Sequence, residues 1–133
     1  MFSVGVSDHC MVAHSFSDPV FGIAQRLHGA TYAVEVEIRA SALGIHNVVM
    51  DIGALREIVR RVLAAIDYSN LDDHSAFPGR TSTSERLAEY LAECIADAIA
   101  ALPPDGRPIE PSVLCVHLRE SPNAWAGYER PIP

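Results

Sequence analysis

Histidine, cysteine and carboxylate side chains are the residues of this sequence that could bind a metal or transfer a proton. The chain has six histidines and three cysteines. Cys10, Cys94 and Cys115 form no Cys-x-x-Cys pair and are odd in number, so the pattern argues against a disulfide framework and suits a reducing compartment. Taken alone, His14 and His28 have the character of structural histidines. Glu120, taken alone, is an ordinary carboxylate at the end of a strand.

The elements that must position these side chains begin with two strands. Residues 2–16 form an extended segment of mixed polarity. Residues 31–42 alternate more clearly, because Tyr32, Val34, Val36 and Ile38 occupy one face and charged residues the other. A period of two with one apolar face predicts an antiparallel sheet that is covered on one side. Residues 17–29 contain Pro19, Gly22 and Gly29, and we expect a loop there.

Two amphipathic helices are expected next. Asp51 is the expected N-cap of the first helix, which carries apolar residues at helical spacing and ends near Asp67. A loop over residues 68–80 separates it from the second helix. Ser82, Thr83, Ser84 and Glu85 fit a capping box that starts this helix at Ser82, and Pro103 and Pro104 end it.

Residues 112–120 alternate as a third strand, and residues 127–132 form a short fourth strand. The order strand, strand, helix, helix, strand, strand predicts an α+β domain: a four-stranded antiparallel sheet with two helices on one face. Such a small sheet has two open edges, which proteins cover or pair. It is therefore suited to joining copies of itself into an oligomeric barrel.

Length and composition limit the function classes. A chain of 133 residues predicts a single domain over residues 1–133. The net charge is −7 with no basic block, which disfavours nucleic-acid binding because phosphate neutralisation supplies most of that affinity. No apolar run has the ~20 residues that a membrane span needs. The amino-terminal residues have no signal-peptide pattern, and we expect a cytoplasmic protein.

Several short segments, in order and spacing, carry a resemblance to a known family. They are Met11-Val12-Ala13-His14, Arg26-Leu27-His28-Gly29, Val49-Met50-Asp51, Ile66-Asp67-Tyr68 followed by Asn70-Leu71, Thr83-Ser84-Glu85 with Leu87-Ala88, and Glu120. The chain resembles, nearly end to end, the 6-pyruvoyltetrahydropterin synthase family, which includes the 6-carboxytetrahydropterin synthases. The resemblance implies the tunnelling fold, in which three subunits join sheets into a barrel and two rings stack into a homohexamer with active sites between subunits.

The resemblance also implies a set of site residues. Family members hold zinc with three histidines, and the zinc polarises the substrate side chain as a Lewis acid. A cysteine transfers protons with the support of an Asp-His pair. A glutamate anchors the amino-pyrimidine edge of the pterin, and the start of the second helix lines the pterin pocket.

This chain departs from the family at the positions that carry the chemistry. His14 and His28 match two zinc ligands, but the third position is Ala30. The cysteine position is Ala24, and the histidine of the Asp-His pair is Tyr68. A methyl group donates nothing to a metal, and tyrosine has an ordinary pKa of about 10, which is unsuited to proton transfer near neutrality. Asp67, by contrast, matches its family position.

The binding chemistry is better retained. Glu120 matches the anchoring glutamate, and Thr83 and Ser84 match the helix start that lines the pterin pocket. A carboxylate can accept two adjacent N–H groups of a guanidine-like edge. We therefore expect a ligand site formed by Glu120, Thr83, Ser84, Asp67, His14 and His28.

Whether another residue replaces the third zinc ligand stays open. His9 lies five residues before His14, which places it on the opposite face of a regular strand. His46 and His74 lie in expected loops, which could bring either of them to the site. We expect an empty metal site rather than a rebuilt one.

We expect a family member without zinc and without the synthase reaction that binds a pterin-like or purine-like molecule. One alternative is an active pterin-processing lyase with a rebuilt metal site. Another is a structural or regulatory oligomer whose pocket is vestigial. The sequence identifies neither the ligand nor the pathway.

Overall fold

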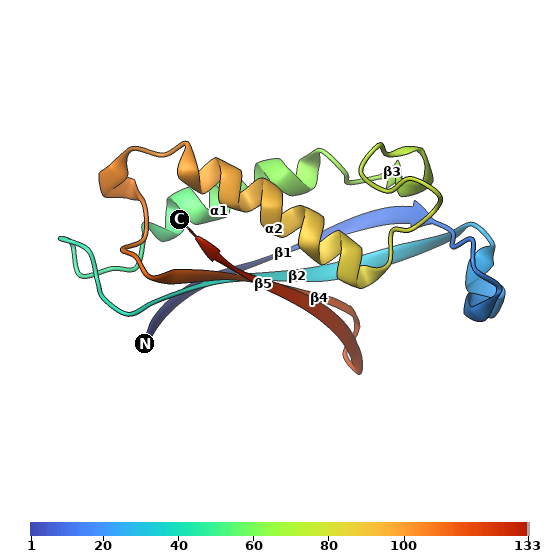
Figure 1. Ribbon diagram of the computed structural model, residues 1–133, viewed down its shortest axis with the longest axis horizontal. Helices are drawn as coiled ribbons and strands as arrows, with labels where there is room; N and C mark the ends of the chain where they lie inside the picture. Colours follow the sequence, from blue (N-terminus) through green and yellow to red (C-terminus); the bar gives the residue numbers. More distant parts are fainter. Residues whose placement is uncertain (133) are drawn as a thin grey trace.

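The computed structural model describes residues 1–132, which form one five-stranded sheet with two helices on one of its faces (Figure 1). The strands are β1 (Phe2–His14), β2 (His28–Ala40), β3 (Ser69–Asn70), β4 (Ser112–Ser121) and β5 (Ala124–Ile132), and their order is β3-β1-β2-β4-β5. The helices are α1 (Ile52–Ala64) and α2 (Ser84–Ala100). Short 3-10 helices span Pro19–Gln25, Leu71–Asp73 and Pro104–Gly106.

The α+β architecture expected from the sequence is confirmed, with two corrections to the sheet. A fifth strand, β3, pairs with the end of β1 in parallel, so the sheet is mixed rather than wholly antiparallel. The second strand begins at His28 rather than Thr31, because its antiparallel ladder with β1 continues to the pair His14 and His28. Neither β3 nor the first residues of β2 have an alternating hydrophobic pattern from which a strand could be predicted.

The alternation expected for the second strand is confirmed. Tyr32, Val34, Val36 and Ile38 are buried beneath the helices, whereas Glu35 and Glu37 on the same strand are exposed. Apolar residues of β4 continue the covered face, and apolar residues of both helices pack on it. This packing removes the apolar face from water and leaves the other face of the sheet polar.

Both helices begin at side-chain caps. Asp51 accepts a hydrogen bond from the amide of Ala54, as expected for the N-cap of α1. The second cap is corrected by one residue, since Thr83 rather than Ser82 accepts from the amide of Arg86. Ser82 is fully buried and its side chain lies against His14. The serine expected to cap the helix therefore contacts the end of β1 instead.

The remaining boundaries differ by a few residues. The first strand ends at His14 rather than residue 16, and α1 ends at Ala64 rather than near Asp67. The last strand begins at Ala124, three residues earlier than expected, because a short turn after Ser121 starts the hairpin ladder. The loop expected over residues 17–29 contains a 3-10 helix. Among residues 1–132, no helix combines the length and apolar composition needed to cross a membrane.

Candidate functional site

A cavity of about 290 Å³ lies where the end of β1, the start of β2, the end of β4 and the start of α2 meet. Its lining consists of His14, Phe16, Phe21, Ala24, His28, Tyr32, Thr83, Ser84, Glu85 and Glu120. Six of the positions singled out in the sequence are therefore brought together in one chain. The elements that supply them are distant in sequence, so the fold rather than local sequence builds the cavity.

The two histidines face each other across paired strands. His14 and His28 are direct partners in the β1–β2 register, and their ring centroids are 4.6 Å apart. His14 is only 2% exposed, and its Nδ1 lies 3.0 Å from the carbonyl oxygen of Ser82. The Nδ1 of His28 lies 2.8 Å from the carbonyl oxygen of Arg26. Because a carbonyl only accepts, each contact favours the tautomer in which Nδ1 donates and Nε2 is left as the acceptor.

Burial sets the charge of His14. Desolvation lowers the pKa of its imidazole, and the neighbouring His28 lowers the pKa further. His14 is therefore expected to be neutral at neutral pH. A neutral imidazole in this position accepts a hydrogen bond or packs against a ring rather than attracting an anion.

Tyr32 connects the sheet to the first turn of α2. Its ring is buried, and its hydroxyl lies 2.9 Å from the hydroxyl oxygen of Ser84. Burial raises the pKa of the Tyr32 hydroxyl, and the carboxylate of Glu120 adds to the increase. Tyr32 therefore keeps its proton, and the two hydroxyls form a neutral pair on the cavity wall.

Glu120 stands at an irregularity of the sheet. Arg119 of β4 pairs with Trp125 of β5, and Ser121 pairs with the adjacent residue Ala124. Glu120 is therefore an extra residue on β4 without a partner in the register. Glu120 lies at this bulge, and bulges often redirect side chains beside binding sites. Its carboxylate is exposed and lines the cavity. It can therefore accept hydrogen bonds from a ligand.

Two predicted site positions lie elsewhere in the chain. The carboxylate of Asp67 accepts a hydrogen bond of 2.8 Å from the amide of Met11, on the edge of β1. Tyr68 follows it with a φ of 58° and is 82% exposed. Neither residue lines the cavity of a single chain. Asp67 instead ties the segment after α1 to the sheet.

The donor set does not fit a catalytic zinc, which needs three protein ligands. Ala30 lies on the same face of β2 as His28 and Tyr32 and packs against the core. His9 is exposed beside Asp8, and His74 packs against Phe77 and Tyr90. Within residues 1–132, no three histidine, cysteine or acidic side chains are grouped as a metal site would require.

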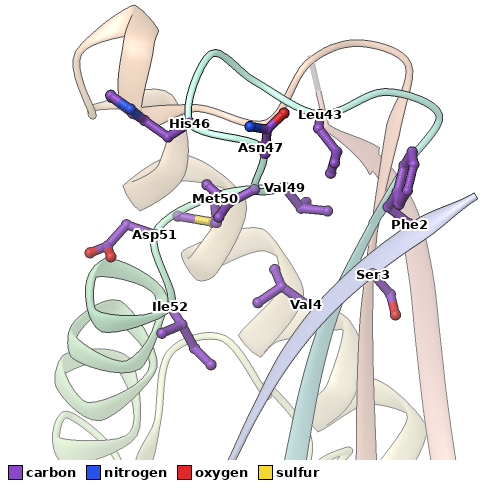
Figure 2. A pocket seen from close by; sticks show the side chains of 11 residues that line it. Phe2, Ser3, Val4, Leu43, His46, Asn47, Val49, Met50, Asp51 and Ile52 are labelled. Atoms are coloured by element: carbon purple, nitrogen blue, oxygen red, sulfur yellow. The ribbon is translucent and has the colours of Figure 1, made fainter.

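His46, the third candidate substitute, lines a different cavity. This cavity has a volume of about 580 Å³ and is lined by residues at the start of β1, whereas His14 ends that strand. Figure 2 shows the lining side chains. Its walls are mostly apolar, and Phe2, Val49 and Met50 are among them. Asp51 lines it too, but its carboxylate caps α1. Although this cavity is larger, it lacks the convergent polar groups of the Glu120 cavity.

Four lining residues were not predicted as site residues: Phe16, Phe21, Tyr32 and Glu85. Tyr32 shares the face of His28 on the alternating strand, so its spacing could have indicated it. Phe16 and Phe21 depend on the path of the chain through the 3-10 helix after β1, which no periodic pattern marks. Glu85 has the character of a capping residue in the sequence alone.

Comparisons with known proteins decide the family. The family model described as 6-pyruvoyl tetrahydropterin synthase matches residues 3–131. The chain belongs to the 6-pyruvoyl tetrahydropterin synthase family. The resemblance on which the sequence analysis relied is thereby confirmed.

Individual relatives agree with this membership. The chain is 25% identical over 127 residues to the 6-carboxy-5,6,7,8-tetrahydropterin synthase of Bacillus subtilis, covering 96% of this chain and 84% of that protein. It is 31% identical over 90 residues to a putative 6-carboxy-5,6,7,8-tetrahydropterin synthase of Archaeoglobus fulgidus, covering 68% and 76%. The 6-pyruvoyl tetrahydropterin synthase of Caenorhabditis elegans superposes with a TM-score of 0.78 at 22% identity, covering 97% and 95%. The tunnelling fold expected for the family is therefore the fold of this chain.

Proposed function

We propose that this protein binds a pterin-like or purine-like heterocycle in the Glu120 cavity, without zinc and without the synthase reaction of its family. The observation that carries the proposal is the placement of the Glu120 carboxylate in a cavity that also holds hydroxyls and aromatic rings. Pockets that combine an apolar wall with a few convergent polar groups are typical of small-molecule sites.

The ring edge that suits Glu120 is an amino-pyrimidine. Such an edge presents neighbouring N–H donors, and one carboxylate accepts two of them side by side. The hydroxyls of Thr83 and Ser84 lie at the start of α2 on the same cavity wall. They can donate to a ring carbonyl. Glu120 thus supplies the acceptors and the helix start supplies the donors.

The residues at the positions that would carry the family's reaction are unsuited to that reaction. Ala24 lines the cavity where the resemblance places a proton-transferring cysteine, and alanine transfers no proton. Ala30 occupies the position where the resemblance implies a zinc ligand, and among the described lining residues His14 and His28 are the two that carry imidazoles. Loss of the cysteine, the third imidazole and the histidine of the Asp-His pair removes both the Lewis acid and the proton relay.

The proposal includes a homohexamer built as two stacked trimers in the cytoplasm. In the described chain, β5 is one edge of the sheet, and β3 covers β1 only at Val12 and Ala13. Long strand edges of this kind are commonly paired with another chain. Measurement of the mass in solution tests the assembly, and a stable monomer would rule it out.

Titration of pterin fluorescence tests the proposed function. Glu120→Gln keeps the shape of the side chain but removes its charge, and we expect it to weaken pterin binding by about tenfold or more. Glu89→Gln is the matched control, because Glu89 lies on α2 paired with Arg86, away from the cavity lining. Equal affinity in the wild type and in Glu120→Gln would refute the anchoring role.

Two other outcomes separate the alternatives. About one zinc per subunit after mild purification would favour the rebuilt metal site of an active lyase. The Nδ1 contacts of His14 and His28 leave two Nε2 atoms as acceptors, which such a site would need. Absence of binding by pterins and guanine derivatives alike would favour a structural or regulatory oligomer with a vestigial pocket.

A further inference from the structure

The outer edge of β1 is closed near the end of the strand. The amide of Met11 donates to the carboxylate of Asp67 at 2.8 Å, and the carbonyl of Met11 accepts from the amide of Tyr68 at 2.7 Å. Both backbone groups of Met11 therefore point away from β2. Alternate residues of a strand direct these groups to the same side, so those of His9 point outwards too. The amide of His9 donates to the carboxylate of Asp8 at 2.7 Å.

The same alternation leaves a short open stretch at the start of β1. Ser3, Gly5 and Ser7 direct their amides and carbonyls outwards, and within residues 1–132 no contact satisfies these groups. We call these three residues the β1 docking edge. Proteins commonly protect an exposed strand edge with charged side chains, and none of these three residues is charged. The β1 docking edge is therefore open to another strand.

The outer edge of β5 has a stretch of the same length. Hydrogen-bonded pairs alternate along each ladder, and carrying this alternation through β2 and β4 turns the odd-numbered residues of β5 outwards. Pro131 has no amide hydrogen, and its carbonyl accepts from Nε of Arg130 at 3.1 Å. Trp125, Gly127 and Glu129 keep outward amides and carbonyls that no contact in the described chain satisfies. We call these three residues the β5 docking edge.

The direction of the strands limits how the two edges can meet. Three antiparallel ladders separate β1 from β5, so these two strands run in opposite directions. A second copy that continues the sheet, with its helices on the same side, presents its β5 antiparallel to β1 of the first copy. Each docking edge offers three positions, and one antiparallel register uses all six.

We propose that β5 of a second copy of this chain adds to the β1 docking edge in that register. The facing pairs are Ser3 with Glu129 of the partner subunit, Gly5 with Gly127 of the partner subunit, and Ser7 with Trp125 of the partner subunit. Each copy keeps one free docking edge for the next copy, so the contact is heterologous and closes into a ring. The inference rests on the proposed assembly and names the residues that build it.

The apolar cavity at the start of β1 adds a hydrophobic component to this contact. Phe2, Val48 and Ile52 line it, and they are 47%, 46% and 47% exposed. Phe2 directly precedes the β1 docking edge, and Ser3 belongs to both the docking edge and the cavity lining (Figure 2). A strand added at this edge therefore lies beside the cavity, where it can remove apolar surface from water.

Cysteine cross-linking at one facing pair tests the register. In the double variant Ser7→Cys, Trp125→Cys, an internal disulfide is excluded because β2 and β4 lie between the two positions of one chain. After mild oxidation of the intact protein, we expect most of the double variant to migrate as disulfide-linked oligomers on a non-reducing gel. Each single variant should match the wild type, which controls for the three native cysteines.

A second pair is the matched control for the register. Ser7→Cys, Ala126→Cys shifts the second thiol by one residue, which turns it to the other face of the sheet. We expect this pair to form at least about tenfold less linked product than the pair with Trp125→Cys.

Proline substitution tests the backbone hydrogen bonds. Ser7→Pro removes an outward amide hydrogen and no ladder bond within the chain, so we expect the mass in solution to fall to that of the monomer. His9→Pro is the control, because the amide of His9 is already bonded to Asp8, and it should leave the mass unchanged. Circular dichroism checks that both variants fold, and the cysteine pairs test the register without them.

The outcomes separate this contact from the proposed assembly. Cross-linking by Ser7→Cys alone would overturn the inference, since two β1 edges would then face each other. An assembled protein in which the Trp125→Cys pair links no better than the Ala126→Cys pair would overturn it too, and would leave the assembly intact. A monomer at all concentrations would refute the assembly together with the contact, whereas the pterin titration tests ring binding separately.

Discussion

His14 and His28 pair directly across β1 and β2, which brings their ring centroids to 4.6 Å. Each Nδ1 lies within hydrogen-bonding distance of a backbone carbonyl. In metal-binding histidines, the ring nitrogen that does not bind the metal commonly donates a hydrogen bond that fixes the orientation of the ring. The arrangement matches the two zinc-ligand positions that the family resemblance implies for His14 and His28, and the third such position is Ala30.

Restoring that imidazole should restore metal binding. Ala30 is on the same face of β2 as His28, so Ala30→His places a third imidazole beside the first two. We expect zinc affinity to rise at least about a hundredfold, as measured by competition with a chromogenic chelator. Thr31→His, on the exposed face of the same strand, is the control and should change nothing. Equal zinc affinity in both variants would show that His14 and His28 are not positioned as ligands.

The hydroxyl contact between Tyr32 and Ser84 should contribute to stability. Tyr32→Phe removes the 2.9 Å hydrogen bond and leaves the buried ring in place. We expect the free energy of unfolding in urea to fall by about 1 kcal/mol. Tyr128→Phe is the control, because Tyr128 packs on the core without a side-chain hydrogen bond among the described contacts. A decrease of the same size in Tyr128→Phe would show that the loss of stability in Tyr32→Phe does not come from the hydrogen bond with Ser84.

Asp67 should stabilise the edge of β1. Asp67→Ala deletes the acceptor for the Met11 amide, and we expect the free energy of unfolding to fall by about 1 kcal/mol or more. Asp67→Asn retains a side-chain oxygen in the same place and should recover part of the loss. Chemical denaturation measures both. If the two variants are as stable as the wild type, the contact between Asp67 and Met11 does not contribute to the free energy of unfolding.

The thiol of Cys10 should make stability fall at alkaline pH. Burial raises its pKa from 9.0 to about 11, and the charges of Asp67 and Asp8 add to the increase. Above pH 9 the unfolded chain loses this proton while the folded chain keeps it, so the free energy of unfolding declines as pH rises towards 11. The expected slope from this group is about 1 kcal/mol for each pH unit. Cys10→Ala should show a shallower decline, and equal slopes would exclude this cause.

The parts of the fold that follow from sequence are those with a clear hydrophobic period. The alternation from Tyr32 to Ile38 predicted a strand with one buried face, and Asp51 predicted the start of α1. The start of β2 at His28 and the short strand β3 were not found. Both depend on pairing with β1, a long-range contact that leaves no periodic signal in the local sequence.

The site residues that the family resemblance names could be predicted from the sequence. The lining residues whose position depends on the three-dimensional path of the chain could not. Glu120, Thr83 and Ser84 meet in one cavity, as the resemblance implies. Phe16 and Phe21 do not follow from any motif, because a 3-10 helix brings the second ring back to the first. Asp67 lies outside the cavity of a single chain, and its contact with Met11 spans 56 residues of sequence.

The central claim is that this site holds a flat nitrogenous ring without a metal. Calorimetric titration of pterin into protein that has been dialysed against a strong chelator, with the residual zinc measured by mass spectrometry, tests it most directly. The account predicts saturable binding whose affinity is unchanged when zinc is added back. Binding that disappears on chelation and returns with stoichiometric zinc would contradict it.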